Sequence, residues 1–77
     1  MRVLFECDEY HNFEKINMYT VPRIGDFIAL EDYFKEEFFK DDDKFLGLVY
    51  SMCWVVDSVT WKKDGFGEYA WILIHGE

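Results

Sequence analysis

Four side chains of the kinds that bind metal ions are spread along the chain. They are Cys7, His11, Cys53 and His75. Zinc ligands usually come in pairs a few residues apart, and these four residues show no such ligand pattern. Their scatter favours thiols that pack in the core and histidines that lie on the surface, so we expect no metal site and no cofactor.

Nucleophilic catalysis has little support in the sequence. Ser51 and Ser58 lie in sequence typical of strands and lack the G-x-S-x-G motif that exposes a catalytic serine. Cys53 and His75 could pair across neighbouring strands, but a free thiol in an apolar run is usually inert. The Gly65-Phe66-Gly67 segment is typical of a hairpin turn and differs from a phosphate-binding loop. We therefore expect a protein that is not an enzyme.

Carboxylates are the most concentrated chemical feature of the chain. The segment Glu31–Lys44, EDYFKEEFFKDDDK, holds seven carboxylates and four aromatic rings, and the whole chain has 16 acidic against 8 basic residues, for a net charge of −8. Phosphate binding needs clustered Lys and Arg, and the longest basic run is Lys62-Lys63. We expect no direct binding of nucleic acid. An acidic field favours a basic protein partner, or it only keeps the protein soluble.

The size and composition of the chain indicate one folded domain, 1–77. Aromatic residues make up 21% of the 77 residues, and large rings bury much apolar area in a small core. The N-terminus MRVLFECDEY lacks the apolar segment of a signal peptide, and no apolar run is long enough to cross a membrane. These observations predict a cytoplasmic protein with free, buried thiols.

The N-terminal part of the chain is predicted to form strands. Polar and apolar residues alternate over Arg2–Asp8, which is typical of a half-buried antiparallel strand. Ile16–Val21 is a weaker candidate strand. Pro22–Asp26 contains a proline and a glycine and breaks the chain, and Phe27–Leu30 resumes as a strand.

The spacing of apolar residues changes over Glu31–Lys40, where they recur at intervals of three and four residues. This spacing predicts a short amphipathic helix whose rings pack on the sheet. The helix is expected to end at Lys40, because Asp41-Asp42-Asp43 at its carbonyl end would oppose the helix dipole. These aspartates are then expected in a solvated loop. The physics of helix ends gives no reason for three aspartates in a row at this position.

The C-terminal part is predicted to form a hairpin. Val49–Trp61 is rich in β-branched and aromatic residues, Asp64-Gly65 is a turn signal, and Glu68–His75 is the returning strand. A two-residue turn at Asp64-Gly65 would give one aliphatic face and one largely aromatic face. The aliphatic face would comprise Val55, Val59, Ala70, Ile72 and Ile74, and the other would comprise Trp54, Val56, Tyr69, Trp71, Leu73 and His75.

Three segments resemble small SH3-like β-barrel proteins of unknown function found in phages and mobile elements. VPRIGDFIAL (Val21–Leu30) resembles their P-x-x-G-[DE]-x-hydrophobic-x-L entry strand, VDSVTW (Val56–Trp61) resembles the V-x-x-V-x-W strand, and AWILI (Ala70–Ile74) resembles the closing strand. The motifs are structural, so the resemblance implies a fold and no function. This chain departs from the barrels that bind nucleic acid in being acidic, and Glu31–Met52 is longer than the expected loop.

The fold expected from these patterns is mainly β (α+β). It would be a small antiparallel, SH3-like β-barrel or a highly curved sheet of four or five strands, with one short inserted helix. The leading hypothesis for function is a non-enzymatic, phage-type inhibitor that binds a basic surface of a host protein and occludes nucleic-acid access. The alternative is an accessory barrel that self-associates or joins a larger complex. The predicted partner-binding residues are Glu31, Asp32, Glu36, Glu37, Asp41, Asp42 and Asp43 as a charged face, with Tyr69 and Trp71 as anchors.

Overall fold

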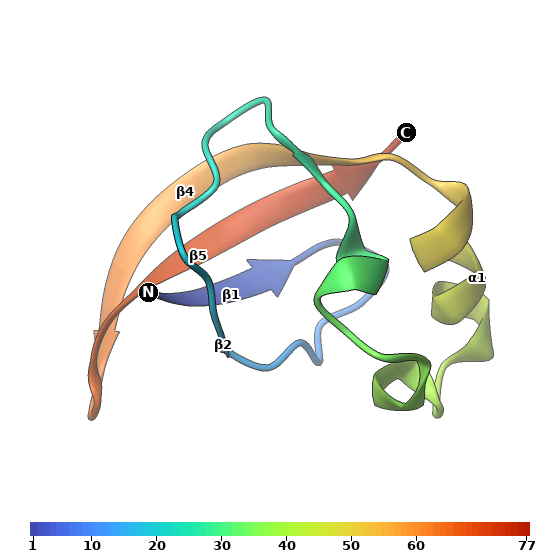
Figure 1. Cartoon of the computed structure of the whole chain (residues 1–77), viewed down its shortest axis with the longest axis horizontal. Coiled ribbons are helices and arrows are strands. Elements are labelled where there is room, and N and C mark those ends of the chain that lie inside the picture. The colour runs from blue at the N-terminus through green and yellow to red at the C-terminus, as the bar shows by residue number, and fades with distance from the viewer.

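Five strands form one mixed sheet that curls into a half-barrel (Figure 1). The computed structural model describes all residues, 1–77. The spatial order of the strands is β2-β1-β5-β4-β3. The strands are β1 (Arg2–Glu6), β2 (Ile16–Asn17), β3 (Phe27–Ile28), β4 (Trp54–Asp64) and β5 (Gly67–Gly76). The expected fold class, a highly curved sheet with one short inserted α-helix, is confirmed.

Strand β1, near the N-terminus, lies beside β5, near the C-terminus. It pairs antiparallel with β2 and parallel with β5, and the β5–β4 and β4–β3 pairings are antiparallel. The predicted alternation holds, because Val3 and Phe5 are fully buried while their neighbours are only partly buried. The middle of the sheet is therefore formed by parallel pairing between residues that lie far apart in the sequence.

The β4–β5 hairpin forms as predicted, with its turn one residue later than expected. Asp64 pairs with Gly67, so Gly65-Phe66 is the two-residue turn. The register therefore shifts by two residues, which leaves the predicted faces of β5 unchanged. A bulge at Asp57, between Val56 and Ser58, then reverses the faces of the first residues of β4.

The bulge changes which residues of β4 share a face with the aliphatic residues of β5. Val56 pairs with Ile74, and Trp54 and Val56 are buried, whereas Val55, expected on the aliphatic face, pairs with His75 and is only partly buried. Beyond the bulge, Val59 pairs with Ile72 as one pair on the core side. A pattern of period two cannot show a bulge, so the sequence predicted the wrong face for Trp54 and Val56.

The α-helix expected at Glu31–Lys40 is wrong. This segment forms two short 3-10 helices, η1 (Leu30–Asp32) and η2 (Glu36–Phe39), with Lys35 extended between them. The single α-helix, α1 (Asp43–Ser51), follows them and includes residues expected in a strand. All three elements lie at one end of the sheet, and the β4–β5 turn lies at the other (Figure 1).

The aspartates explain where α1 begins. The Asp42 carboxylate accepts a hydrogen bond from the Phe45 N–H at 2.9 Å and is the N-cap, and Asp43 lies in the first turn. Both positions favour carboxylates, because unpaired N–H groups and the positive end of the helix dipole are found there. The expectation that Asp41–Asp43 is a solvated loop after a helix is therefore wrong for two of its three residues.

A cluster of aromatic rings fills the space between the sheet and the helical segment. Tyr10 stacks on Phe45 with ring centroids 4.6 Å apart, and Phe39 and Phe13 meet Tyr10 edge to face. Phe45 also contacts Trp54 at the start of β4. Phe34 is therefore buried in the core and Phe38 packs against it, as the sequence predicted. Tyr33 is 45% exposed, which corrects the expectation that its ring packs on the sheet.

Candidate interaction surfaces

Six of the seven predicted carboxylates are exposed, and Asp42 is partly buried by its capping role. Glu31 and Asp32 lie on η1, Glu36 and Glu37 lie on η2, and Asp43 lies on α1. Because α1 packs against both η1 and η2, the structure brings most of the predicted charged face together at one end of the molecule. We refer to residues 31–44, with the adjoining Glu9 and Glu14, as the acidic helical side.

Two carboxylates of this side were missed in the sequence. Glu9 lines a shallow hollow together with Asp42 and Lys44, and Glu14 lines another with Glu37. Both belong to the segment between β1 and β2, which is folded against the helical elements. The sequence held no signal for this contact, because the two segments are far apart along the chain.

The charge of the acidic helical side is not compensated by internal ion pairs. Its nine carboxylates and three lysines leave −6, while the seven carboxylates and five basic residues of the remaining chain leave −2, in agreement with the total of −8. None of the ion pairs in the structure involves a residue of this side. The four ion pairs are Arg2–Asp64, Lys15–Asp64, His75–Asp57 and His75–Glu77.

Tyr50 is an exposed aromatic side chain among these carboxylates. It is 56% exposed, and its hydroxyl donates a hydrogen bond to Glu36 Oε1 at 3.2 Å. Desolvation and the carboxylates of Glu36 and Glu31 raise the pKa of Tyr50. Tyr50, predicted in a strand, lies on α1. The N-cap Asp42 followed by apolar residues at helical spacing is the signal that could have placed it on a helix.

The predicted anchors Tyr69 and Trp71 do not belong to the acidic helical side. They alternate along β5 with buried core residues, so they lie on the outer face of the sheet, which points away from the helices. The Lys62 ammonium lies 4.0 Å from the Trp71 ring centroid, and the Lys15 ammonium lies 4.4 Å from that of Tyr69. Both rings are therefore partly covered by cations of their own chain.

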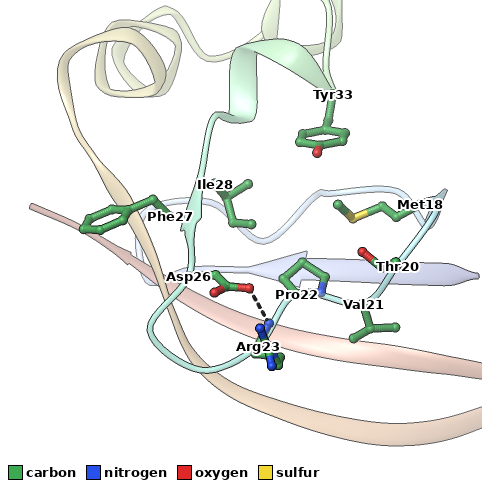
Figure 2. A pocket seen from close by; sticks show the side chains of 9 residues that line it. All are labelled: Met18, Thr20, Val21, Pro22, Arg23, Asp26, Phe27, Ile28 and Tyr33. Carbon is green, nitrogen blue, oxygen red and sulfur yellow. Dashed lines mark hydrogen bonds between the residues drawn. The ribbon is translucent and has the colours of Figure 1, made fainter.

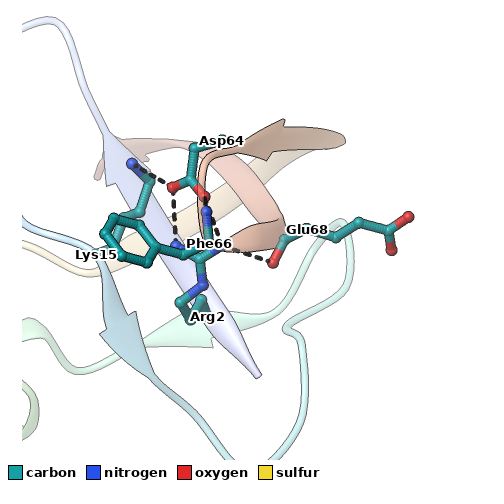
Figure 3. A network of polar contacts seen from close by, with 5 residues as sticks. All are labelled: Arg2, Lys15, Asp64, Phe66 and Glu68. Carbon is teal, nitrogen blue, oxygen red and sulfur yellow. Dashed lines mark hydrogen bonds and ion pairs between the residues drawn. The ribbon is translucent and has the colours of Figure 1, made fainter.

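A polar cluster ties the hairpin to β1 beside these rings (Figure 3). Arg2 donates two hydrogen bonds to the Asp64 carboxylate, at 2.8 and 2.9 Å, and Lys15 lies 3.2 Å from the same carboxylate. The Asp64 carboxylate also accepts the Phe66 N–H of the turn at 2.8 Å. The bond from Arg2, followed by that from Phe66, holds the pKa of Asp64 well below its usual range. We assign this cluster to the architecture of the sheet.

The thiols and histidines do not form the Cys53–His75 pair considered above. The His75 imidazole is bonded to Asp57 at 2.5 Å and Glu77 at 3.0 Å, and these bonds raise its pKa. Cys7 is buried as expected, and burial raises its pKa to about 11. Cys53 is exposed, which corrects the prediction of two buried thiols. No three His, Cys, Asp or Glu side chains are grouped as metal ligands.

A hollow of about 500 Å³ lies beside β3 (Figure 2). Its walls combine apolar and polar surface, with Arg23 and Asp26 as the charged residues. The full lining is Met18, Thr20, Val21, Pro22, Arg23, Asp26, Phe27, Ile28 and Tyr33. A second hollow shares Val21, Pro22 and Arg23 with the first and adds Ile24, Val59 and Trp61.

Several large apolar side chains around these hollows are exposed. Ile24 is 71% exposed and Phe27 is 72% exposed, and the Trp61 ring is half exposed. Exposed apolar side chains that gather in one place are typical of interaction sites. Ile24 and Phe27 were predicted only as part of a barrel strand, so their exposure is a feature that the sequence did not reveal.

No protein-family model, curated protein or solved structure matches the chain. The resemblance to small SH3-like barrels of phages and mobile elements therefore stays a prediction. No helix in the structure has both the length and the apolar character needed to cross a membrane.

Proposed function

We propose that this protein is a non-enzymatic binding protein whose acidic helical side docks on a basic surface of a partner protein. The observation that carries the proposal is the one-sided distribution of charge, with −6 of the total −8 on this side and no internal ion pair to reduce it. A carboxylate cluster of this kind attracts the surfaces that attract phosphates. A partner held in this way would be blocked from binding nucleic acid.

Electrostatic steering would orient the protein before contact. The acidic helical side lies at the end of the molecule opposite the hairpin turn (Figure 1), so the charge is separated along the sheet. Charges of this kind act over about 8–10 Å at physiological salt and mainly raise the rate of association. Tyr50 and Tyr33, both exposed at this end, would supply apolar contact once the surfaces meet.

The proposal is tested with a double substitution that removes charge and no contact. Glu31 and Glu37 are exposed and form no side-chain hydrogen bond or ion pair in the structure. The immobilised protein is used at low salt to isolate a partner, and the dissociation constant is then measured for the wild type and for Glu31→Gln/Glu37→Gln. We expect the double variant to bind about 5- to 10-fold more weakly, the effect of two partly screened contacts.

The matched control is Glu6→Gln/Glu68→Gln, which removes the same charge from the sheet. Neither side chain forms an ion pair, and both lie outside the acidic helical side. This control should bind within about twofold of the wild type, because neither side chain belongs to the docked surface. Equal losses in both double variants would mean that only total charge matters and would refute docking through the helical side.

A self-associating accessory module is the second candidate, and the open sheet edges favour it. Strands β2 and β3 are the end strands of the sheet, and each leaves one edge free to pair with another strand. Each copy carries −8, so association between copies should strengthen as salt screens their repulsion. Binding to a basic partner should weaken over the same range, and sedimentation velocity at two salt concentrations distinguishes the candidates.

A further inference from the structure

The free edge of β3 presents backbone groups that have no partner. The Val56 N–H donates to the Asp26 carbonyl at 3.0 Å, so in the antiparallel β3–β4 ladder the next residue, Phe27, directs its N–H and C=O away from β4. Ala29 follows with the same orientation, and its N–H takes part in no hydrogen bond. The edge therefore offers a donor and an acceptor at Phe27 and a second donor at Ala29.

The hollow beside this edge combines apolar side chains, polar groups and one cation that is in no ion pair. Ile28, Pro22 and Met18 supply apolar surface, and Figure 2 shows the hydroxyl oxygen of Tyr33 directed toward the hollow. Arg23 is in no ion pair, in contrast to Arg2. The Asp26 carboxylate accepts the backbone N–H of Arg23 at 2.8 Å, so the guanidinium stays available.

We propose that the edge of β3 and the hollow beside it bind an extended peptide segment of a partner protein. The peptide adds a strand next to β3 through the backbone groups of Phe27 and Ala29. Alternate side chains of an added strand point to one face, so apolar ones enter the hollow. One carboxylate of the peptide, from Asp, Glu or a free C-terminus, pairs with the Arg23 guanidinium.

The charge around the edge favours such a peptide over a second copy of this chain. Glu31 and Asp32 follow β3 directly and are exposed. Two copies paired edge to edge through β3 would bring these four carboxylates close together, which is unfavourable. A peptide with a single carboxylate avoids that repulsion. This inference goes beyond the proposed function, and apart from Tyr33 the residues that line the site lie outside the acidic helical side.

Ala29→Pro removes one donor of the edge. Ala29 has φ −87°, about 20° from the value that proline fixes, and its side chain is exposed. Its N–H forms no bond within the protein, so no internal bond is lost. Ala29→Ser is the matched control, because it changes the side chain and keeps the N–H.

The probe is a displayed library of random 12-residue peptides selected on the immobilised wild-type protein. The dominant peptide is synthesised with a fluorescent label, and its affinity is measured by anisotropy. We expect selected peptides with alternating apolar residues and one carboxylate. Ala29→Pro should weaken binding about fivefold, the effect of one backbone hydrogen bond, and Arg23→Glu should weaken it at least about tenfold.

Two further controls separate this site from other surfaces. Lys63→Glu makes the same charge reversal at an exposed hairpin position. Glu37→Gln/Asp41→Asn removes two exposed charges of the acidic helical side that do not adjoin β3. Both variants should leave peptide affinity within about twofold. A loss confined to Glu37→Gln/Asp41→Asn would place the peptide on the acidic helical side and overturn the inference while leaving the proposed function standing.

Other outcomes also overturn the inference. Library selection that enriches no peptide, or a selected peptide that binds Ala29→Pro and Arg23→Glu as well as the wild type, excludes the edge as the site. NMR chemical shifts of the Phe27 and Ala29 amides are also measured at several protein concentrations without peptide. Shifts that change with concentration would show that a second copy of the chain occupies the edge. Circular dichroism checks the fold, and if Ala29→Pro is unfolded, the affinity of Arg23→Glu decides the question.

Discussion

Substitution of Asp42 separates the structural role of the aspartates from their charge. The Asp42 carboxylate accepts the Phe45 N–H at 2.9 Å and begins the nine-residue helix α1. Asp42→Ala removes this bond and leaves an N–H without a partner. Asp42→Asn keeps an oxygen in the same position, and asparagine is as good an N-cap as aspartate. The two variants therefore lose the same charge, but only the first loses the cap.

The expected cost follows from the geometry of the cap. Loss of an N-cap side chain costs about 1 kcal/mol of unfolding free energy, within a range of about 0.5–2 kcal/mol. For a chain of 77 residues the unfolding entropy is about 0.16 kcal/mol per degree, so Asp42→Ala should lower Tm by about 6 °C. Asp42→Asn should lower Tm by less than about 2 °C, because it loses only the charge near the helix N-terminus.

The assay is thermal unfolding followed by far-UV circular dichroism, with Asp41→Ala as the control. Asp41 is exposed and caps no helix, so its substitution should change Tm little. The reasoning is refuted if Asp42→Ala is as stable as the wild type, or if Asp41→Ala is equally destabilised. Either result would mean that α1 does not begin at Asp42.

Three other predictions concern the core, the thiols and the pH dependence of stability. Trp54→Ala should cost about 3–5 kcal/mol in urea unfolding, because Trp54 is fully buried, whereas Trp61→Ala should cost less than about 1.5 kcal/mol, because half of the ring is exposed; equal costs would contradict the bulged register. In the native protein, a thiol reagent should label the exposed Cys53 quickly and the buried Cys7 only on unfolding, and fast labelling of both would contradict this burial. The pKa of Asp64 is lower in the folded protein than its unfolded value near 3.8. Its contribution to stability is therefore complete above about pH 4 and is lost as pH falls toward the folded value. Denaturant unfolding should show a smaller loss of stability below about pH 4 for Asp64→Asn than for the wild type, and identical slopes would contradict the effect.

The sheet could be predicted because its signals are local. Alternating residues over Arg2–Glu6 and the turn glycines at the end of β4 indicate which segments are strands and which side chains of β5 share a face. Neither pattern reveals the bulge at Asp57. The extra residue of a bulge interrupts the alternation, but no particular residue type marks its position in the sequence. The parallel pairing of β1 with β5 depends on contacts between the two ends of the chain.

The helical segment was mispredicted because two signals competed there. The spacing of the rings in Glu31–Phe39 fits a helix, but the extended backbone at Lys35 divides the segment and lets Phe34 and Phe39 both reach the core. The aspartates were interpreted as the end of a helix when Asp42 begins one. An N-cap interpretation of Asp42 would have predicted α1 and placed Tyr50 beside Glu36.

The candidate site could be predicted only in part. Composition identified the acidic residues 31–43, and the structure brings them together with Glu9 and Glu14. The anchors Tyr69 and Trp71 were chosen from their density in the hairpin, and alternation along β5 places them on the opposite face of the sheet. The free edge at Phe27 and Ala29 depends on strand order, which no local pattern encodes.

Competition for the isolated partner tests the central claim most directly. A fluorescent oligonucleotide is bound to the partner, and the concentration of this protein needed to displace half of it is measured at low salt. Wild type should displace the oligonucleotide, and Glu31→Gln/Glu37→Gln should need about 5- to 10-fold more protein, while Glu6→Gln/Glu68→Gln should match the wild type. A ternary complex that retains the oligonucleotide, or equal displacement by all three proteins, would contradict docking through the acidic helical side.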